Sequence, residues 1–221
     1  MTDRATRTNR LLVFDLDGTL YDTRTSFVPT MRVVYSDFGL PYPGDSVVLD
    51  FVGEPYSVFL DWLLEQGLPG DRDALGRRIS EIELASIRER GKLFPDVRDT
   101  LVALREGGYA ASLCTNGDMV YAEAVLSATG VLPLFNELQT NETEGHTKAE
   151  LVRDLLRRAP HERAFMIGDR YHDMQAGRAN GCTVIGVTYG YGSAEELEVA
   201  DRLIDAFSDL PRVLEDVDPR T

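Results

Sequence analysis

Four short apolar runs, separated by segments with helical character, constrain the fold of this chain most strongly. The runs cover residues 11–14, 110–114, 164–167 and 183–188. Each is the length of a buried strand, and helices are expected between the last three runs and after the fourth. These helices are predicted at residues 119–129, 148–158, 172–180 and 194–200. Such alternation predicts an α/β fold with a Rossmann-like, doubly wound parallel sheet and helices on its faces.

The stretch from residue 23 to residue 93 differs from the rest, because it has helical spacing and no clear strand. Val58, Trp62 and Leu63 repeat at helical intervals, as do Ile79, Ile82 and Ala85. Glycine and proline clusters break the stretch into short helices. We therefore predict a helical cap domain at 23–93, inserted into an α/β core domain made of 1–22 and 94–221. An amphipathic helix at 97–106 is expected where the core resumes.

The charge of the chain limits its partners. It has 23 basic and 37 acidic residues, a net charge of −14, and no basic run that could follow a nucleic-acid backbone. Binding to nucleic acid or to an anionic membrane is therefore not expected. A phosphate-bearing substrate would need local positive potential, and Lys92 and Lys148 are the two lysines of the sequence.

The location of the protein is inferred from what its sequence lacks. The first ten residues contain no apolar stretch like that of a signal peptide. No apolar run approaches the roughly 18 residues of a membrane span. Cys114 and Cys182 are too few for a disulfide framework and are interpreted as reduced core residues. These features predict a cytoplasmic protein, and no signal indicates its oligomeric state.

Polar residues follow three of the predicted strands. Asp15 and Asp17 follow the first, Thr115, Asn116 and Gly117 the second, and Asp169 the third, with Asp173 four residues later. Ligands of open parallel sheets bind outside the carboxyl ends of the strands. The side chains are therefore expected to meet at one edge of the sheet.

Four motifs containing these residues resemble those of the haloacid dehalogenase-like hydrolases. They are DLDGTLYD at 15–22, CTNG at 114–117, TKAEL at 147–151 and GDRYHD at 168–173. Their order agrees with the family, and so does the helical insertion after the first motif. The segment GVTYGYGSAEEL at 186–197 is similar to the phosphoglycolate phosphatase-like branch. The resemblance implies a phosphatase acting on a small phosphorylated metabolite, such as phosphoglycolate, a sugar phosphate or a nucleotide.

The resemblance also implies roles for particular residues. Asp15 would be the nucleophile and form an aspartyl-phosphate, while Asp17 would protonate the leaving alkoxide and then activate water. Thr115, Lys148 and the backbone N–H groups of Asn116 and Gly117 would bind the phosphoryl oxygens.

A magnesium ion is expected beside the nucleophile. Mg²⁺ prefers oxygen ligands, which Asp15, Asp169 and the backbone carbonyl of Asp17 would supply. Asp173 is either a further ligand or a group that orients the ligands.

Other functions of the same fold stay open. A phosphomutase would share the nucleophile, the acid and the metal. A non-catalytic phospho-acceptor would also carry a phosphorylated aspartate, although Asp17 is placed to hasten its hydrolysis. A dehalogenase would not need Asp17. Substrate choice is expected to depend on the cap, where Gly53, Glu54 and Tyr56 are candidates.

Overall fold

The computed structural model describes residues 10–143 and 145–219, and a parallel β-sheet forms its centre. The strands are β1 (Arg10–Phe14), β2 (Ala110–Cys114), β3 (Glu137–Gln139), β4 (Arg163–Gly168), β5 (Thr183–Val187) and β6 (Arg202–Ile204). Their order across the sheet is β3-β2-β1-β4-β5-β6. The chain first moves outward from β1 on one side and then returns to β4 on the other, so the strand order reverses between β1 and β4. This is the predicted doubly wound α/β fold.

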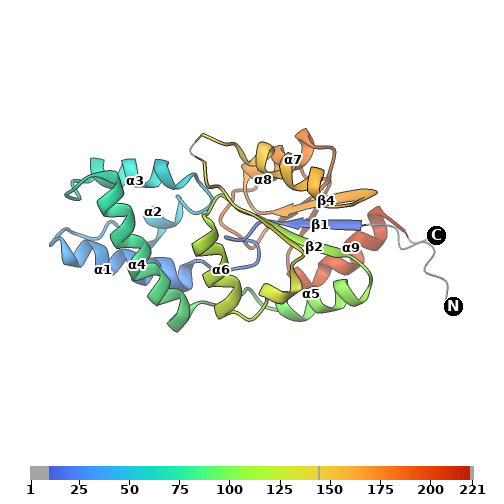
Figure 1. The fold of residues 1–221 in the computed structure, drawn as a ribbon, viewed down its shortest axis with the longest axis horizontal. Helices are drawn as coiled ribbons and strands as arrows, with labels where there is room; N and C mark the ends of the chain where they lie inside the picture. Colours follow the sequence, from blue (N-terminus) through green and yellow to red (C-terminus); the bar gives the residue numbers. More distant parts are fainter. Residues whose placement is uncertain (1–9, 144, 220–221) are drawn as a thin grey trace.

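Alternating side chains of β1 show how the two faces of the sheet are covered. Leu12 and Phe14 pack with one layer of helices, and Leu11 and Val13 pack with the other. The first layer contains α5 (Val97–Glu106), α6 (Met119–Ala128) and α9 (Leu210–Val217), and the second contains α7 (Lys148–Arg158) and α8 (Tyr171–Ala179). Figure 1 shows α7 and α8 on the side of the sheet opposite α5 and α9. Both faces of the sheet are thus buried, as continuous apolar runs predict.

Most of the predicted elements are present, and the prediction of one helix is wrong. The four predicted strands and the helices at 97–106, 119–129, 148–158 and 172–180 form within a residue or two of the expected bounds. Residues 194–199 form turns instead of the predicted helix. Ser193 and Glu196 make capping hydrogen bonds, as at the start of a helix. The backbone bonds that follow join residues three apart, not four, so the segment forms turns. The chain then reaches Asp201, whose N–H donates to the Val184 carbonyl beside β5.

The inserted segment forms four helices with their own core. They are α1 (Arg24–Asp37), α2 (Asp45–Leu49), α3 (Tyr56–Glu65) and α4 (Arg72–Arg90). Aromatic and aliphatic side chains fill a cluster separate from the one around the sheet. The helical period was predicted, but part of the buried face was not. Leu63 and Ile79 are buried, as their place in the predicted period indicates. Val58 is 46% exposed and Ala85 is exposed, whereas Phe59 in α3 and Ile87 in α4, which the sequence analysis did not name, are buried.

The two connections between the cap and the core run side by side. Tyr21 and Leu93 form an antiparallel bridge, the Asp22 N–H donates to the Lys92 carbonyl at 2.9 Å, and the Phe94 N–H donates to the Leu20 carbonyl at 3.0 Å. The cap lies at the end of the molecule opposite α9 (Figure 1). No helix in the described residues is both long enough and apolar enough to cross a membrane.

Candidate active site

The site lies at the carboxyl ends of the central strands, where the strand order reverses. The Asp15 N–H bonds to the Ile167 carbonyl at 2.9 Å, which continues the pairing of β1 with β4 by one residue. The Thr115 N–H does the same with the Gln139 carbonyl at 3.0 Å, beyond β2 and β3. Backbone pairing therefore orients these two residues before any ligand is bound.

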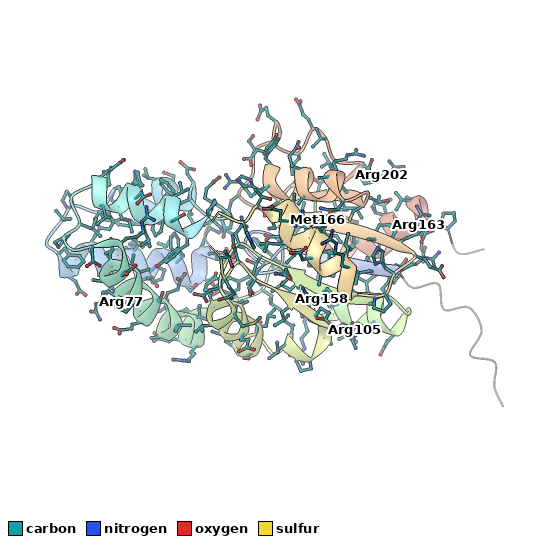
Figure 2. The ribbon with its side chains drawn as sticks, turned by 45° about the horizontal axis from the view of Figure 1, so that its top comes forward. Arg77, Arg105, Arg158, Arg163, Met166 and Arg202 are labelled. Carbon is teal, nitrogen blue, oxygen red and sulfur yellow. The ribbon has the colours of Figure 1, made fainter. Side chains whose placement is uncertain are left out.

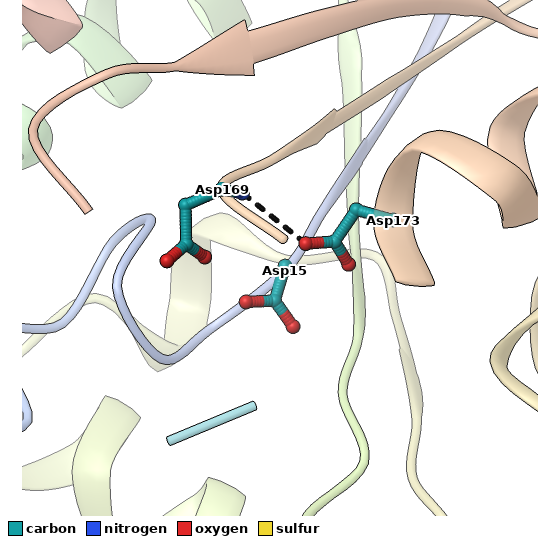
Figure 3. A group of neighbouring side chains, drawn as sticks. All are labelled: Asp15, Asp169 and Asp173. Atoms are coloured by element: carbon teal, nitrogen blue, oxygen red, sulfur yellow. Dashed lines mark hydrogen bonds between the residues drawn. The ribbon is translucent and has the colours of Figure 1, made fainter. Parts of the chain in front are cut away.

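Three buried aspartates converge at this edge. Single carboxylate oxygens of Asp15, Asp169 and Asp173 lie within 4.8 Å of one another, as Figure 3 illustrates. Hydrogen bonds hold two of them. Asp169 accepts from the Thr19 hydroxyl at 3.2 Å and from the Tyr191 N–H at 2.7 Å. Asp173 Oδ2 accepts from the N–H of Asp169 at 3.1 Å and of Arg170 at 3.0 Å.

Lys148 brings one positive charge to the three carboxyl groups. It is the first residue of α7, where Thr147 and Glu150 form a capping box. Its Nζ contacts Asp15 Oδ1, and lies 2.5 Å from Asp173 Oδ1. Burial alone would lower the pKa of Lys148, but the Asp15 and Asp173 carboxylates outweigh burial and the pKa lies above its ordinary value. Lys148 is therefore charged at neutral pH.

The single positive charge of Lys148 does not balance the negative charges of three carboxylates. The pKa values of Asp15 and Asp169 are both raised. Burial raises the pKa of Asp15, although the Lys148 charge opposes the shift. Burial, and next the charge of Asp173, raise the pKa of Asp169 to about 7. A divalent cation would relieve this repulsion, and clustered carboxylate oxygens are the ligands that Mg²⁺ prefers. The residues present therefore fit a magnesium ion.

Asp17 has surroundings different from those of the three clustered aspartates. Its Oδ1 accepts hydrogen bonds from the Thr23 hydroxyl at 2.7 Å and from the Tyr121 hydroxyl. Burial raises the pKa of Asp17, and these two hydrogen bonds lower it by less than burial raises it. Two carboxyl groups two residues apart thus occupy separate environments, one beside an ammonium and one beside hydroxyl groups.

The turn between these two environments requires glycine. Gly18 has φ +82°, and a Cβ there would overlap the Asp169 carboxylate and approach the Tyr191 ring to 2.8 Å. Any other residue at this position would displace the acidic cluster.

The segment after β2 has two different contacts. The Thr115 hydroxyl oxygen accepts from the Gly117 N–H at 3.1 Å, which leaves the hydroxyl proton free to be donated. The Asn116 side-chain amide donates to the Gly53 carbonyl of the cap at 2.9 Å. Thr115, Asn116 and Gly117 all line the cavity described below.

Arg170 makes further contacts between the core and the cap. Its guanidinium donates to the Asp50 carbonyl at 3.4 Å and to the Val52 carbonyl at 2.5 Å, and pairs with Glu54 at 3.1 Å. His172 lies 3.4 Å from the same glutamate. The predicted specificity candidates Gly53 and Glu54 thus lie at the junction of the two domains.

A cavity of about 280 Å³ joins the strand edge to the cap. Its walls include Asp15, Asp17 and Thr115 from the core. Tyr56 and Glu83 are among the cap residues that line it. Sequence analysis identified the core residues from their motifs, but it did not identify Tyr121 or Glu83.

Comparison with known proteins agrees with this geometry. Residues 12–187 match the family model described as haloacid dehalogenase-like hydrolase, and the chain belongs to that family. A phosphoglycolate phosphatase of Haemophilus influenzae is 28% identical, over 93% of this chain and 98% of that protein. This relationship places the chain near the phosphoglycolate phosphatase branch and identifies it as a hydrolase of the phosphatase type.

Solved structures of low sequence identity share the fold. A predicted phosphoglycolate phosphatase from Haemophilus somnus has a TM-score of 0.83 at 24% identity, covering 95% of this chain and 99% of its own. A structure described as a putative β-phosphoglucomutase from Thermotoga maritima has a TM-score of 0.76 at 22% identity, covering 94% and 99% of the two chains. The fold is therefore common to proteins described as phosphatases and as mutases.

Proposed function

We propose that this protein is a magnesium-dependent phosphatase that hydrolyses a small phosphomonoester through an aspartyl-phosphate on Asp15. The observation that carries the proposal is that Asp15 and Asp17 line one cavity, while Lys148 contacts Asp15 from the buried side. The relatives named phosphoglycolate phosphatase support the same class of substrate. The cytoplasmic location predicted from the sequence is part of this proposal.

Asp15 acts in the first step. A carboxylate oxygen of Asp15 attacks phosphorus, and the bond between phosphorus and the leaving oxygen breaks. Asp17 gives its proton to that oxygen, so the alcohol leaves uncharged. The raised pKa of Asp17 favours the protonated form that this step requires.

Asp17 acts again in the second step. Water attacks phosphorus, Asp17 takes a proton from that water, and the bond from phosphorus to the Asp15 oxygen breaks. Inorganic phosphate leaves, Asp15 is again a carboxylate, and Asp17 is again protonated. Lys148, the free hydroxyl proton of Thr115 and the Asn116 backbone N–H bind the phosphoryl oxygens on which charge develops.

Asp15, Asp169 and the Asp17 carbonyl would hold Mg²⁺, which would supply positive charge to the carboxylates and to the phosphoryl group. Both carboxylate oxygens of Asp173 already contact Lys148 or backbone N–H groups. We therefore assign Asp173 to positioning Lys148 and the 168–173 loop beside the ion.

The test is phosphate release from phosphoglycolate, sugar phosphates and nucleoside monophosphates, with Mg²⁺ or with a chelator. Wild-type protein should release phosphate only with Mg²⁺. Asp15→Asn should reduce kcat by ~10⁴-fold or more while the protein stays folded, because the substituted amide is no nucleophile. Asp216→Asn, an exposed aspartate of α9, is the matched control and should retain wild-type rates.

Three results would contradict the proposal. Appreciable turnover by Asp15→Asn would exclude the aspartyl-phosphate. A sugar phosphate isomer, formed in place of inorganic phosphate, would identify a mutase. A stable phosphoprotein without turnover would identify a phospho-acceptor.

A further inference from the structure

The cap side of the cavity differs in chemistry from the strand edge. Aromatic rings from three cap segments line it, namely Phe27, Phe51, Tyr56 and Phe59. Ser80 and Glu83 of α4 are polar lining residues on the same side. Among the described residues that line the cavity there is no lysine, arginine or histidine. Figure 2 labels Arg77 on the cap and Arg105, Arg158, Arg163 and Arg202 on the core, and none of these five lines the cavity. Arg170, at the junction of the two domains, pairs with Glu54 and Glu196.

Glu83 is the unusual member of this lining. It is 9% exposed, and it lies on the buried face of α4 between Ile79 and Ile87. No group in the described part of the chain donates a hydrogen bond to its carboxyl group or pairs with it. Burial raises the pKa of Glu83 to about 8, with smaller contributions from the charges of Asp17 and Asp118. Because Glu83 lines the cavity, a ligand bound there can supply the hydrogen-bond donor that the described part of the chain does not.

The other carboxyl groups around the cavity already have partners. Glu54 pairs with Arg170 at 3.1 Å, and Asp118 accepts from the Tyr121 N–H at 2.8 Å as the cap of α6. Asp15 contacts Lys148, and Asp17 accepts from two hydroxyl groups. Glu83 is therefore the carboxyl group that a substrate would satisfy.

We propose that Glu83 selects the leaving group, and that the substrate is a phosphomonoester of an amino alcohol whose ammonium group binds Glu83 among the aromatic rings of the cap. This inference rests on the function proposed above and adds the chemical class of the leaving group. An ammonium group supplies hydrogen-bond donors and a positive charge. The described part of the chain offers Glu83 neither of these. Aromatic rings attract cations as well. A carboxylate leaving group, as in phosphoglycolate, would meet an acid here and no base.

The test compares phosphomonoesters that differ only at the end of the alcohol. Aminoethyl phosphate, hydroxyethyl phosphate and phosphoglycolate form one set, and the corresponding esters with one more carbon form a second. Wild-type kcat/KM should be at least about tenfold higher for the amine than for the hydroxyl ester, and lowest for the carboxylate. This order is expected at the chain length that reaches Glu83.

Glu83→Gln removes, at nearly constant volume, the carboxyl group that would become the carboxylate partner of the bound ammonium. The variant should lose about tenfold or more in kcat/KM for the amine ester, gain for the carboxylate ester, and change little for the hydroxyl ester. Glu81→Gln is the matched control, because Glu81 lies on the same helix with its side chain 72% exposed. It should leave the order of the three esters as in wild type.

A binding measurement separates the two proposals. The melting temperature of the Asp15→Asn protein, with Mg²⁺, should rise more with the amine ester than with either other ester or with inorganic phosphate. The role of Glu83 would be overturned if, in both ester series, the carboxylate or hydroxyl ester were turned over and bound at least as well as the amine ester. So would an unchanged ratio of amine to carboxylate ester in Glu83→Gln. Absence of turnover by wild type for all esters and for p-nitrophenyl phosphate would overturn the proposed phosphatase, while the binding order would still decide the role of Glu83.

Discussion

The buried acids of the core and the buried acid of the cap differ in how they are satisfied. At the strand edge, Asp15 and Asp173 contact Lys148, and Asp169 and Asp17 accept hydrogen bonds from hydroxyl and backbone groups. In the cap, Glu83 has no such donor among the described residues. Both regions bury carboxyl groups, but among the described residues those at the strand edge have partners within the chain and Glu83 has none.

This difference indicates how the two domains divide their work. A site whose groups are already oriented does not have to reorganise during the reaction, so it suits the chemical step. A group that lacks a partner gains most from a ligand that supplies one, so it suits discrimination between ligands. The two proposals thus assign phosphoryl transfer to the core and the choice of the alcohol to the cap.

The largest effect is expected when the buried ammonium group of the core, on Lys148, is removed. Lys148→Ala leaves three buried carboxyl groups without an ammonium, and we expect turnover to fall by ~10³-fold and the free energy of unfolding by ~3–5 kcal/mol in a chelator. Mg²⁺ should restore part of the melting temperature if, as proposed, it binds Asp15 and Asp169 in the folded state. Lys92→Ala, at an exposed position, is the control and should stay within about 0.5 kcal/mol of wild type. Equal stability of the two variants would show that the core acids do not depend on Lys148.

A second test separates the two carboxyl environments of the core. Asp17→Asn removes the proposed proton donor but leaves the proposed nucleophile Asp15, so the loss of activity should depend on the leaving group. We expect kcat/KM to fall by ~10²–10⁴-fold for an alkyl phosphate and by at most about tenfold for p-nitrophenyl phosphate, whose phenolate leaves without a proton. The ratio kcat/KM reports the first step and is not affected by the second, in which Asp17 acts as a base for both esters. Equal losses for the two esters, measured by steady-state kinetics, would contradict the role of Asp17 as an acid.

The smallest expected effect is on the thermal stability of the protein, and it concerns Glu83 of the cap. The pKa of Glu83 is about 8 in the folded protein and near 4.5 when unfolded, so the folded state holds the proton more tightly. Stability should therefore fall as the pH rises from about 4.5 through 8, and Glu83→Gln should remove this part of the fall. We expect the variant to melt several degrees above wild type at pH 8 and close to wild type at pH 5. Glu81→Gln should follow the wild-type curve, and a parallel curve for Glu83→Gln would contradict a buried, unpartnered acid.

The sequence predicted the core more completely than the cap because the signals of the core are local. Strands buried on both faces are continuous apolar runs, and the motifs follow them directly. Strands β3 and β6 were missed because each has three residues and no apolar run of its own. Tyr121 was missed because it lies 104 residues from Asp17, and only the folded chain brings the two together.

Glu83 had a signal that sequence analysis did not use. Ile79, Glu83 and Ile87 are spaced by four residues, so they lie on one face of a helix. Sequence analysis continued from Ile79 to Ile82 and Ala85 instead, and Ala85 is exposed. A charged residue in the middle of an apolar helix face is a better guide to a ligand-binding group than the hydrophobic period alone.

The bridge between Tyr21 and Leu93 bears on how such proteins diversify. Because the chain leaves the core and re-enters it at neighbouring positions, the insertion has the topology of a hairpin loop. Long insertions at such positions cost little in chain entropy. Residues 24–91 could be exchanged for another cap, or for a short turn, with all six strands still paired. Specificity can thus be grafted or lost through one segment of the gene, while the catalytic strand ends are inherited unchanged.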